Sequence, residues 1–356
     1  MRVFQSLSHQ RGCILVTRQQ VISQYLPNIT EAGEVAQSFA PSNIALCKYW
    51  GKRDRELNLP MNASLSVSLG ALGSHTRIMP SDNGVDQVFL NGQAQNMEQP
   101  FASKVIDFLN LFRRDLEQPV IIRTENNIPT AAGLASSASG FAALMLAIND
   151  FYRFNLPKKT LSVFARMGSG SASRSIYDGF VEWHKGTRTD GMDSFAEQLD
   201  LQWPDFRIAL LKVSTGAKKV DSRAGMQRTL ESAVLYQSWP QQANDDLVTI
   251  KRALNNHDFE QLGVAAENNA LAMHATMIAS WPPLLYWTAE SVSAMHRVWE
   301  LRASGVGVYL TMDAGPNLKL LFESGDQGAV EDAFPELADS DIVAPFASSG
   351  QPLITS

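Results

Sequence analysis

The segment 129–140 combines small residues with serine hydroxyls, the residue types that let a backbone loop approach and bind a phosphate. It follows a β-branched stretch and precedes an apolar, helix-forming stretch, so it is predicted to lead into a helix N-terminus. There the first backbone N–H groups have no partner within the helix and the dipole is positive, so a phosphate can bind the main chain without a lysine. Ser136, Ser137 and Ser139 add hydroxyl donors or a metal ligand. A glycine- and serine-rich turn with a helix cap explains this composition equally well.

A second segment, 40–54, concentrates positive charge beside two aromatic residues. Lys48, Lys52, Arg53 and Arg55 lie in it or directly after it, although the chain is acidic overall. Charge-assisted hydrogen bonds are the strong ones, so such a cluster suits a multiply charged anion. Taken alone, the segment is nevertheless more typical of a solvated basic turn.

The segment 168–174 is another loop of small residues, and it ends on an arginine. Ser171 and Arg174 are three positions apart and share a face if a helix has begun. Hydroxyls and backbone N–H groups can then hold a phosphate while the guanidinium binds a carboxylate with two parallel hydrogen bonds. The alternative is a flexible linker, and an arginine directly after the loop argues against it.

Two more segments place charged residues beside predicted elements. Residues 218–226 contain three cations around a possible helix start, with Asp221 or Ser222 as the N-cap, and a surface charge cluster explains them almost as well. In 311–317, Asp313 follows an apolar strand and precedes a Gly-Pro turn. It either starts the turn through its side chain or serves as a catalytic carboxylate on a rigid element, and the segment alone leaves both open.

These segments must be positioned by a mixed fold, because helical and strand patterns occur together without a strict period. Asn91-Gly92 after the strand-like 87–90 is a strong two-residue hairpin signal, so antiparallel pairing and an α+β fold are expected. The Trp-Pro-Asp step at 203–205 is the predicted lobe boundary. Helical patterns cover 101–113, 134–152, 159–167, 242–255, 258–279 and 284–302, and strand patterns cover 206–213 and 306–312.

The composition is that of an ordinary globular protein. Its 356 residues, 45% hydrophobic and 19% charged, are enough for one large or two ordinary domains with a full core. The net charge of −6 argues against a nucleic-acid partner, since proteins of that class usually show a basic excess. Two cysteines are too few for a disulfide framework, and no run of about 18 apolar residues occurs, so a cytoplasmic protein with no membrane partner is expected.

The first 30 residues contain no Asp or Glu and carry three arginines, which superficially resembles an organelle transit peptide. The stronger interpretation is an additional N-terminal element of the fold. Its apolar residues are Ile14, Leu15, Val16, Val21, Ile22 and Leu26. An upstream start codon could also create such a leader.

Taken in order, the motifs of this chain resemble those of the mevalonate diphosphate decarboxylases of the GHMP kinase superfamily. The resemblance rests on KYWGKRD at 48–54 with LPMN at 59–62, AGLASS at 132–137, GSGSASRS at 168–175 and MDAGPN at 312–317. DGMDSFA at 190–196, and HAT through WPP at 274–283, also resemble the family's patterns. The similar part of the chain runs from about residue 39 to residue 322.

The resemblance implies an ATP-dependent decarboxylation of mevalonate 5-diphosphate to isopentenyl diphosphate, carbon dioxide, ADP and phosphate, with Mg²⁺ as cofactor. A tertiary hydroxyl is a poor leaving group, so ATP first phosphorylates it. Loss of the carboxylate then relieves the electron demand that the departing phosphate leaves. By motif match, Asp313 would lie against the 3-hydroxyl and Arg174 would bind the substrate carboxylate, with Lys48 and Asn43 supporting charge and geometry.

The same match assigns residues to the two phosphate-bearing ligands. Those that would hold the substrate diphosphate are Tyr49, Lys52, Ser169, Ser171, Ser222 and Arg223, with Met226 nearby. Those that would wrap the ATP phosphates are Ala132, Gly133, Leu134, Ala135, Ser136 and Ser137, with Ser137 near the γ-phosphate or the magnesium ion. No dedicated cluster of metal ligands is visible in the sequence.

The resemblance also implies the fold, a two-lobe α+β protein that forms a homodimer. Its N-terminal lobe would be ribosomal-protein-like with a left-handed βαβ unit, and its C-terminal lobe would be ferredoxin-like. The lobes would be 39–203 with the phosphate loop and 204–356 with Asp313, after an extension at 1–38 that is longer than the family needs. Residue 173 is Ser where Cys is common in the family, and this departure touches no core role.

Other residues and activities compete with this interpretation. Asp190 and Asp193 are rival bases for a related kinase, which would phosphorylate mevalonate or a phosphomevalonate without decarboxylation. A non-enzymatic binding protein would be expected to have lost Asp313 or Arg174, and both are present. His274, in a helical stretch, is expected to be a packed structural residue rather than a base.

Overall fold

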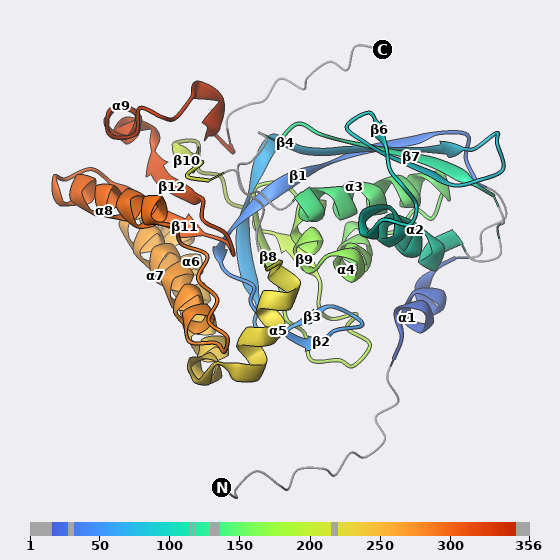
Figure 1. Cartoon of the computed structure of the whole chain (residues 1–356), viewed down its shortest axis with the longest axis horizontal. Coiled ribbons are helices and arrows are strands. Elements are labelled where there is room, and N and C mark those ends of the chain that lie inside the picture. The colour runs from blue at the N-terminus through green and yellow to red at the C-terminus, as the bar shows by residue number, and fades with distance from the viewer. Residues whose placement is uncertain are drawn as a thin grey trace, which may run out of the picture.

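The computed structural model describes residues 16–27, 32–113, 116, 118–128, 136–214 and 220–346. Figure 1 shows two groups of elements, one built from the N-terminal half of the chain and one from the C-terminal half, which meet beside β1 and β4. Each group contains a sheet and its own helices. The predicted α+β class is therefore confirmed.

In the described part of the chain, the first sheet has seven strands and is mainly antiparallel. They are β1 (Ala36–Cys47), β4 (Ser64–Pro80), β5 (Gln87–Leu90), β6 (Gln93–Ala94), β7 (Val120–Asn126), β8 (Phe180–Trp183) and β9 (Ala196–Gln198). Their order is β6-β5-β7-β4-β8-β9, with β1 paired to β4 and β5 parallel to β7. The predicted hairpin is confirmed, since Asn91 and Gly92 join β5 to β6 and both have the positive φ of a type I′ turn.

Helices cover one face of this sheet (Figure 1). They are α2 (Pro100–Arg113), α3 (Ser136–Phe151) and α4 (Lys158–Gly168). α3 packs against β1 and β4, and its Ala142 and Ala143 are fully buried, so helix and sheet backbones approach closely. Phe112 of α2 contacts both Phe108 and Phe164, which links α2 to α4. The helices predicted here are confirmed in the described residues.

The first described residues form an additional helix, α1 (Arg18–Tyr25), which Thr17 caps. Val21 and Ile22 are 1% and 0% exposed and join the core of the first sheet. Burying two such side chains contributes about 3 to 6 kcal/mol. The predicted N-terminal element is therefore confirmed for this helix, whereas residues 1–15 lie outside the described ranges.

The second sheet has four antiparallel strands in the order β11-β12-β10-β13 within the described ranges. They are β10 (Phe206–Leu211), β11 (Val308–Met312), β12 (Leu318–Glu323) and β13 (Ile342–Val343). The helices of this half are α5 (Ser222–Ser232), α6 (Trp239–Asn256), α7 (Phe259–Ile278), α8 (Ala289–Ala303) and α9 (Gln327–Ala333). The remaining elements are η1 (Gly170–Ile176), η2 (Val234–Ser238), η3 (Ser324–Asp326) and η4 (Asp339–Asp341), which are 3₁₀ turns, and the ribbon of β2 (Lys52–Asp54) with β3 (Leu59–Pro60).

The predicted elements of the second half are present, with shifted ends. α6 begins at Trp239, earlier than predicted, because Pro240 fits the first turn of a helix. α8 begins at Ala289, later than predicted, because Thr288 caps it and accepts a hydrogen bond from the Ser291 backbone N–H. The two predicted strands are β10 and β11.

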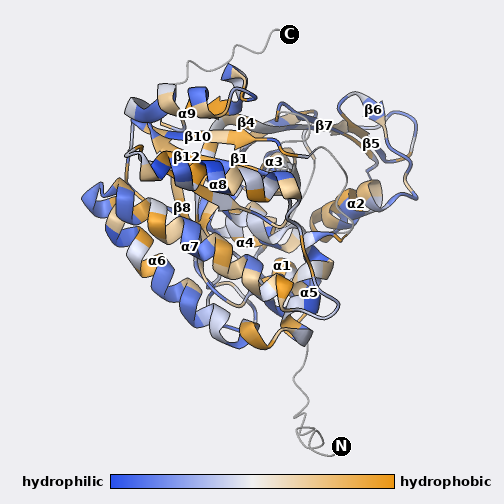
Figure 2. Cartoon of the chain, turned by 60° about the vertical axis from the view of Figure 1, so that its left-hand side comes forward, coloured by the Kyte–Doolittle hydropathy of each residue, from blue (hydrophilic) through white to orange (hydrophobic). Residues whose placement is uncertain are grey.

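The two sheets share a hydrophobic core. Ile44 and Val67 of the first sheet lie in the same buried cluster as Ile208 of the second, together with Leu254 of α6 and Leu262 of α7. Figure 2 shows hydrophobic and hydrophilic residues along both α6 and α7, as expected for helices with one buried face. This common core sets the two halves against each other, so the ends of β1 and β11 lie close together.

Three further predictions can be compared with the fold. The first sheet ends at Gln198 and the second begins at Phe206, so the predicted step at 203–205 lies between them, while the lobe boundaries themselves stay a prediction. Cys47 is a buried free thiol. No helix in the described ranges is long and apolar enough to cross a membrane.

Candidate active site

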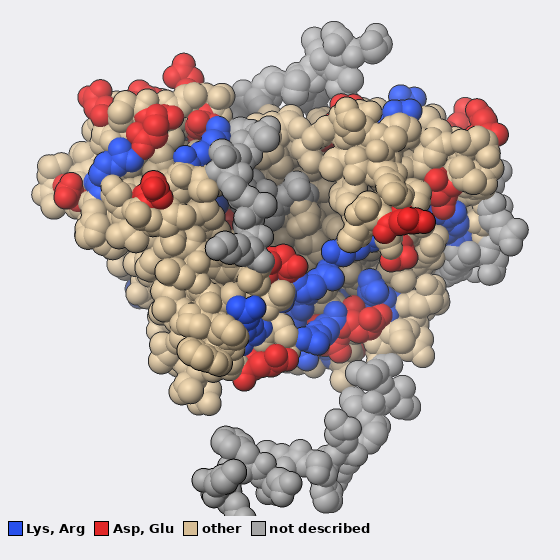
Figure 3. Space-filling model, in the orientation of Figure 1, with Lys and Arg blue, Asp and Glu red and all other residues tan. Residues whose placement is uncertain are grey.

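A cavity of about 720 Å³ is lined by residues from both halves of the molecule. On the face shown in Figure 3, lysine and arginine side chains gather at the hollow between the two halves. Arg53, Arg55 and Ser139, which the sequence also suggested, are not among the described residues that line this cavity. Ser139 is instead buried and hydrogen-bonded to the hydroxyls of Ser42 and Ser74. The cavity does bring together all residues that the family resemblance assigns to the ligands and whose side chains are described. They are Asn43, Lys48, Tyr49, Lys52, Ser137, Ser169, Ser171, Arg174, Ser222, Arg223, Met226 and Asp313. The predictions that lie outside the described side chains are those for Ala132, Gly133, Leu134, Ala135 and Ser136.

Asp313 and Lys48 form an ion pair at the ends of two strands. Asp313 follows β11 and Lys48 follows β1, which belong to different halves of the molecule. Lys48 Nζ lies 2.9 Å from Asp313 Oδ1, and the Lys48 side chain is 2% exposed whereas that of Asp313 is 36% exposed. Burial lowers the pKa of Lys48, and the Asp313 carboxylate opposes this shift. The pair therefore presents a carboxylate to the cavity while its ammonium partner stays buried.

Buried amide side chains fix the backbone at Lys48. The Lys48 N–H donates to Asn269 Oδ1 at 2.7 Å, and the Asn269 amide donates to Asp246 Oδ2 at 2.8 Å. The Asn62 amide donates to the Lys48 carbonyl oxygen at 2.7 Å. These contacts hold the start of the lysine side chain in one place, and the sequence motifs did not point to Asn269.

Arg174 is a buried cation with neutral hydrogen-bond partners. It lies in η1 and is 3% exposed. Its Nη1 donates to Ser64 Oγ at 2.6 Å, and its Nε and Nη2 donate to Asn43 Oδ1 at 3.4 and 3.3 Å. Burial lowers the pKa of Arg174 to about 10, which leaves it charged at neutral pH. No carboxylate of the described residues forms a salt bridge with it, so the guanidinium is available to an anionic ligand.

The Tyr49 hydroxyl is buried and has no hydrogen-bond partner among the described residues. Its ring packs on Trp183 with centroids 4.8 Å apart. Glycine is needed at position 170, because a Cβ at Gly170 would lie 2.9 Å from the Tyr49 ring. Burial raises the pKa of Tyr49, so the hydroxyl keeps its proton and can donate to a ligand oxygen. Ser169 and Ser171 flank the glycine and line the same cavity.

The N-terminus of α5 reaches the cavity through Ser222 and Arg223. Asp221 accepts a hydrogen bond from the Ala224 N–H at 2.9 Å, which confirms it as the N-cap. Lys52 reaches the cavity from β2, and burial lowers its pKa to about 8, with a further contribution from the Arg223 charge. Two cations and a helix N-terminus thus serve one ligand-binding region.

The rival bases lie elsewhere. Asp190 forms an ion pair with Arg188, and Asp193 accepts hydrogen bonds from the backbone N–H groups of Thr187 and Arg188. Neither aspartate is among the described residues that line the cavity. Asp313 is therefore the better placed carboxylate for chemistry in this cavity.

His274 lies on the buried side of Asp313. It is 1% exposed, and its Nε2–H donates to the Asp313 carbonyl oxygen at 3.1 Å. Its ring also packs against Trp287, with centroids 5.3 Å apart. Burial lowers the pKa of His274 to about 4, so it is neutral at neutral pH. The packed position predicted for this histidine is confirmed.

Two family models together match most of the chain. The diphosphomevalonate decarboxylase-like N-terminal domain matches residues 40–196. The mevalonate 5-diphosphate decarboxylase C-terminal domain matches residues 208–343. The chain belongs to the diphosphomevalonate decarboxylase family. The resemblance predicted from the motifs is thereby confirmed.

Individual diphosphomevalonate decarboxylases are similar over most of their length. One from Aspergillus fumigatus is 38% identical over 316 residues, which cover 83% of this chain and 78% of the relative. One from Danio rerio is 36% identical over 331 residues, which cover 88% and 80%. A solved structure, MDDEF in complex with MVAPP, AMPPCP and magnesium, is 40% identical with a TM-score of 0.81 and covers 87% of this chain and 95% of that one. The mevalonate diphosphate decarboxylase structure from Staphylococcus aureus is 38% identical with the same TM-score, and covers 87% and 94%.

A single hydroxyl at the start of α3 suits the magnesium ion that this family resemblance implies. Ser137 Oγ lies 3.4 Å from Ser169 Oγ, at the wall of the cavity. Mg²⁺ takes oxygen ligands and keeps several waters and phosphate oxygens, so one or two protein oxygens are enough. The residues present therefore fit an ion held mainly through ATP.

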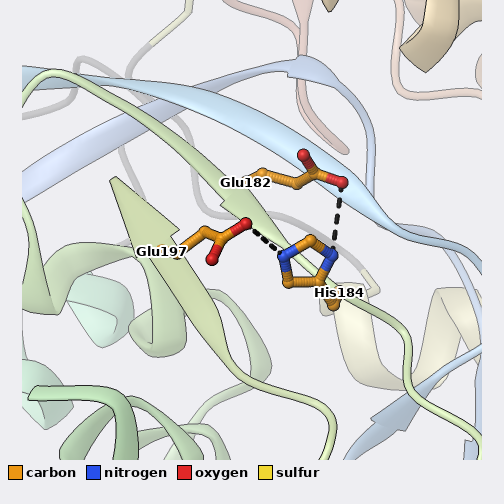
Figure 4. A group of neighbouring side chains, drawn as sticks. All are labelled: Glu182, His184 and Glu197. Atoms are coloured by element: carbon orange, nitrogen blue, oxygen red, sulfur yellow. Dashed lines mark hydrogen bonds and ion pairs between the residues drawn. The ribbon is translucent and has the colours of Figure 1, made fainter. Parts of the chain in front are cut away.

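A group of potential metal ligands in the described residues lies outside the cavity. Figure 4 shows Glu182 and Glu197 at the two ring nitrogens of His184. Nδ1 lies 3.3 Å from Glu182 Oε1, and Nε2 lies 2.7 Å from Glu197 Oε1. Lys251 of α6 approaches the other Glu182 oxygen at 2.6 Å. Each side chain is already paired, so the cluster joins β8 and β9 to α6 rather than offering open ligands.

The sequence motifs also missed Lys319, a second lysine at Asp313. It lies in β12, its side chain is 2% exposed, and its Nζ is 3.5 Å from Asp313 Oδ2. The available signal is one lysine within the otherwise apolar run 318–322. Ser64, which holds Arg174, carries no comparable signal, because serines are common in its strand.

Proposed function

We propose that this chain catalyses the ATP-dependent decarboxylation of mevalonate 5-diphosphate to isopentenyl diphosphate, carbon dioxide, ADP and phosphate. The observation that carries the proposal is one cavity lined by Asp313, Lys48 and Arg174, which lie directly after β11, directly after β1 and in η1. Membership of the diphosphomevalonate decarboxylase family supports the same reaction. So does the similar solved structure with MVAPP, AMPPCP and magnesium.

This reaction brings three anionic groups to one site: the substrate carboxylate, its diphosphate and the ATP phosphates. ATP phosphorylates the 3-hydroxyl and so creates a good leaving group. As that phosphate departs, the electron pair of the bond to the carboxylate carbon forms the new double bond, and carbon dioxide is released. Positioning and electrostatic stabilisation supply most of the catalysis in phosphoryl transfer. The cations of the cavity suit this task.

Asp313 takes the proton of the 3-hydroxyl as the hydroxyl oxygen attacks the γ-phosphate. Its carboxylate is the exposed member of the ion pair with Lys48, so it can reach a ligand in the cavity. Lys48 orients the carboxylate and adds positive charge near the transferred phosphate. His274 holds the Asp313 backbone and is a poor proton acceptor, because burial lowers its pKa to about 4.

Arg174 binds the substrate carboxylate. The guanidinium is buried and charged, and Ser64 and Asn43 hold it in one orientation through neutral hydrogen bonds. A carboxylate supplies the compensating charge and accepts two parallel hydrogen bonds. This contact aligns the bond that breaks with the departing phosphate.

The substrate diphosphate is held by hydroxyls, cations and the N-terminus of α5. The residues with this role are Tyr49, Lys52, Ser169, Ser171, Ser222 and Arg223, with Met226 beside them. The Tyr49 hydroxyl, which has no partner in the described part of the chain, supports the assignment, since a buried donor without an acceptor is costly until a ligand oxygen arrives.

Binding of this diphosphate should weaken as pH rises through about 8, because the pKa of Lys52 is lowered to about 8 and the ammonium form is the one that binds. Loss of one required proton weakens affinity by up to about tenfold per pH unit above that value. The measurement is the dissociation constant of mevalonate 5-diphosphate between about pH 7 and pH 9.5. Lys52→Arg is the matched control, since arginine stays protonated and should flatten the profile. An equally steep profile in Lys52→Arg would exclude Lys52 as the titrating group.

The loop 132–137 wraps the ATP phosphates, with Ser137 at the γ-phosphate or at the magnesium ion. The Ser137 hydroxyl would help to hold a magnesium ion there, which would supply positive charge to offset that of the phosphates. The sixteen-residue helix α3 begins at Ser136. The first N–H groups of a helix have no partner within that helix, and together with the positive dipole they suit the same phosphates.

We also propose the finer organisation implied by the family. Residues 39–203 form a ribosomal-protein-like lobe with a left-handed βαβ unit, and residues 204–356 form a ferredoxin-like lobe, after an extension at 1–38. The separate sheets of the two halves support this division. The homodimer and the cytoplasmic location expected from the sequence stay predictions.

The test of the proposed function is one incubation of the protein with ATP, Mg²⁺ and mevalonate 5-diphosphate, in which ADP, phosphate and carbon dioxide are measured together. Equal release of all three products is the expected result, because phosphorylation and decarboxylation are coupled through one leaving group. ADP without phosphate or carbon dioxide would instead identify a related kinase that stops at the phosphorylated product. The matched control omits mevalonate 5-diphosphate and reports any ATP hydrolysis without substrate.

A further inference from the structure

Two buried ammonium groups contact the Asp313 carboxylate, although one would balance its charge. Lys48 Nζ lies 2.9 Å from Oδ1, and Lys319 Nζ lies 3.5 Å from Oδ2. Both lysine side chains are 2% exposed. Each carboxylate oxygen therefore has its own cation, one from the first half of the chain and one from the second.

The sheet does not need a charge at Lys319. β12 lies between β11 and β10, and the cross-strand neighbours of Lys319 are Thr311 and Leu210. Leu318 and Leu320 on either side of it are fully buried. Burying an ammonium group is unfavourable unless it is compensated, and an apolar residue would avoid the penalty. Lys48 already pairs with Asp313, so stability alone does not explain the buried ammonium group of Lys319 at the same carboxylate.

We infer that Lys319 is a positioning residue for the reaction, acting through Asp313. It holds the second carboxylate oxygen, so that the carboxylate cannot turn away from the 3-hydroxyl, and it keeps the carboxylate ionised and ready to accept a proton. Lys319 is not among the described residues that line the cavity, so it acts without contacting substrate. The inference rests on the proposed function, which makes Asp313 the base.

Among the described residues, charged and titratable groups from four elements act on Asp313. They are Lys48 after β1, Lys319 on β12, Arg174 in η1 and His274 on α7. His274 donates to the backbone rather than to the carboxylate. Removing Lys319 alone should therefore change the protonation of Asp313 in one direction, towards tighter proton binding.

Lys319→Met tests the inference, because methionine keeps the length and packing of the side chain without the charge. We expect kcat to fall by about a hundredfold through misplacement of the base, with the KM for mevalonate 5-diphosphate nearly unchanged. The acid limb of the kcat/KM profile should move to higher pH, because the carboxylate loses a neighbouring positive charge. A merely structural lysine would not move that limb.

Two comparisons make the result decisive. Lys212→Met removes another lysine of the same half, one that pairs with Asp341 outside the cavity, and should leave kcat and the acid limb unchanged. The double variant of Lys319→Met with Asp313→Asn should be no slower than Asp313→Asn, since both act through one carboxylate. Wild-type kcat with an unmoved limb in Lys319→Met overturns the inference. If that variant does not fold, Lys319→Gln is judged by the same criteria, whereas absence of turnover in the wild type contradicts the proposed function instead.

Discussion

Replacing Arg174 by glutamine should lower kcat/KM for decarboxylation by about a thousandfold, the loss expected when one partner of a buried charge pair is removed. Glutamine can still donate to Ser64 or Asn43, which hold the arginine in the wild type. It cannot supply the positive charge or the two parallel hydrogen bonds that the substrate carboxylate requires. The loss should therefore appear in carbon dioxide release, measured by initial rates over a range of substrate concentrations.

The same substitution should not destabilise the free protein. Arg174 is buried, and no described carboxylate forms a salt bridge with it, so a neutral side chain removes a buried charge that the nearby Asp313 compensates only in part. A melting temperature equal to or above that of the wild type, together with lost activity, is the expected combination. Arg113→Gln is the matched control, because it breaks the pair with Asp86 away from the cavity. Arg113→Gln should lower the melting temperature and leave turnover unchanged. Normal turnover in Arg174→Gln, with a lower melting temperature, would contradict the role of Arg174.

Asp313→Asn should lower kcat by about a thousandfold, within the range of general acid–base contributions, while substrate binding is retained. The amide cannot accept the proton of the 3-hydroxyl, although it has nearly the same shape. Removing a negative charge from a cavity that receives three anions should leave the dissociation constant unchanged or lower it. The measurements are single-turnover rates for chemistry and equilibrium titration for binding.

Asp190→Asn is the matched control for this prediction. Asp190 pairs with Arg188 outside the cavity, so its amide variant should turn over at a rate close to that of the wild type. Near-normal turnover in Asp313→Asn would contradict the base role of Asp313. A large loss in Asp190→Asn would instead revive the rival kinase base. Thermal melting must accompany both, because Asp313→Asn leaves Lys48 and Lys319 without their shared carboxylate.

Local signals predicted much of the fold. The hairpin at Asn91-Gly92 was predictable because few residues tolerate positive φ at both turn positions. Side-chain chemistry narrowed the cap of α5 to Asp221 or Ser222, and the structure shows that it is Asp221. Helix ends were less predictable where caps compete. α8 begins at Ala289 because Thr288 caps it there, whereas the apolar pattern alone pointed further upstream.

The residues of the candidate site also fall into two groups, those that a local motif predicts and those that only strand pairing brings to the site. Lys48, Arg174 and Asp313 stand in short motifs of charged and small residues, so their types and their order along the chain are enough to indicate anion chemistry. Lys319 and Ser64 lie within β12 and β4, where neighbouring residues in sequence say nothing about what lies across the sheet. Both were missed because their partners are set by strand register.

The sequence by itself determined the class of the fold, the family and residue types that line the cavity, because turns, caps and motifs are encoded over a few neighbouring residues. Only the tertiary structure decided that Lys48 and Lys319 take opposite oxygens of Asp313, and that Arg174 is buried among neutral partners. Those contacts join residues from β1, η1, β11 and β12. They depend on how the shared core packs the two sheets together, and no local pattern carries that information.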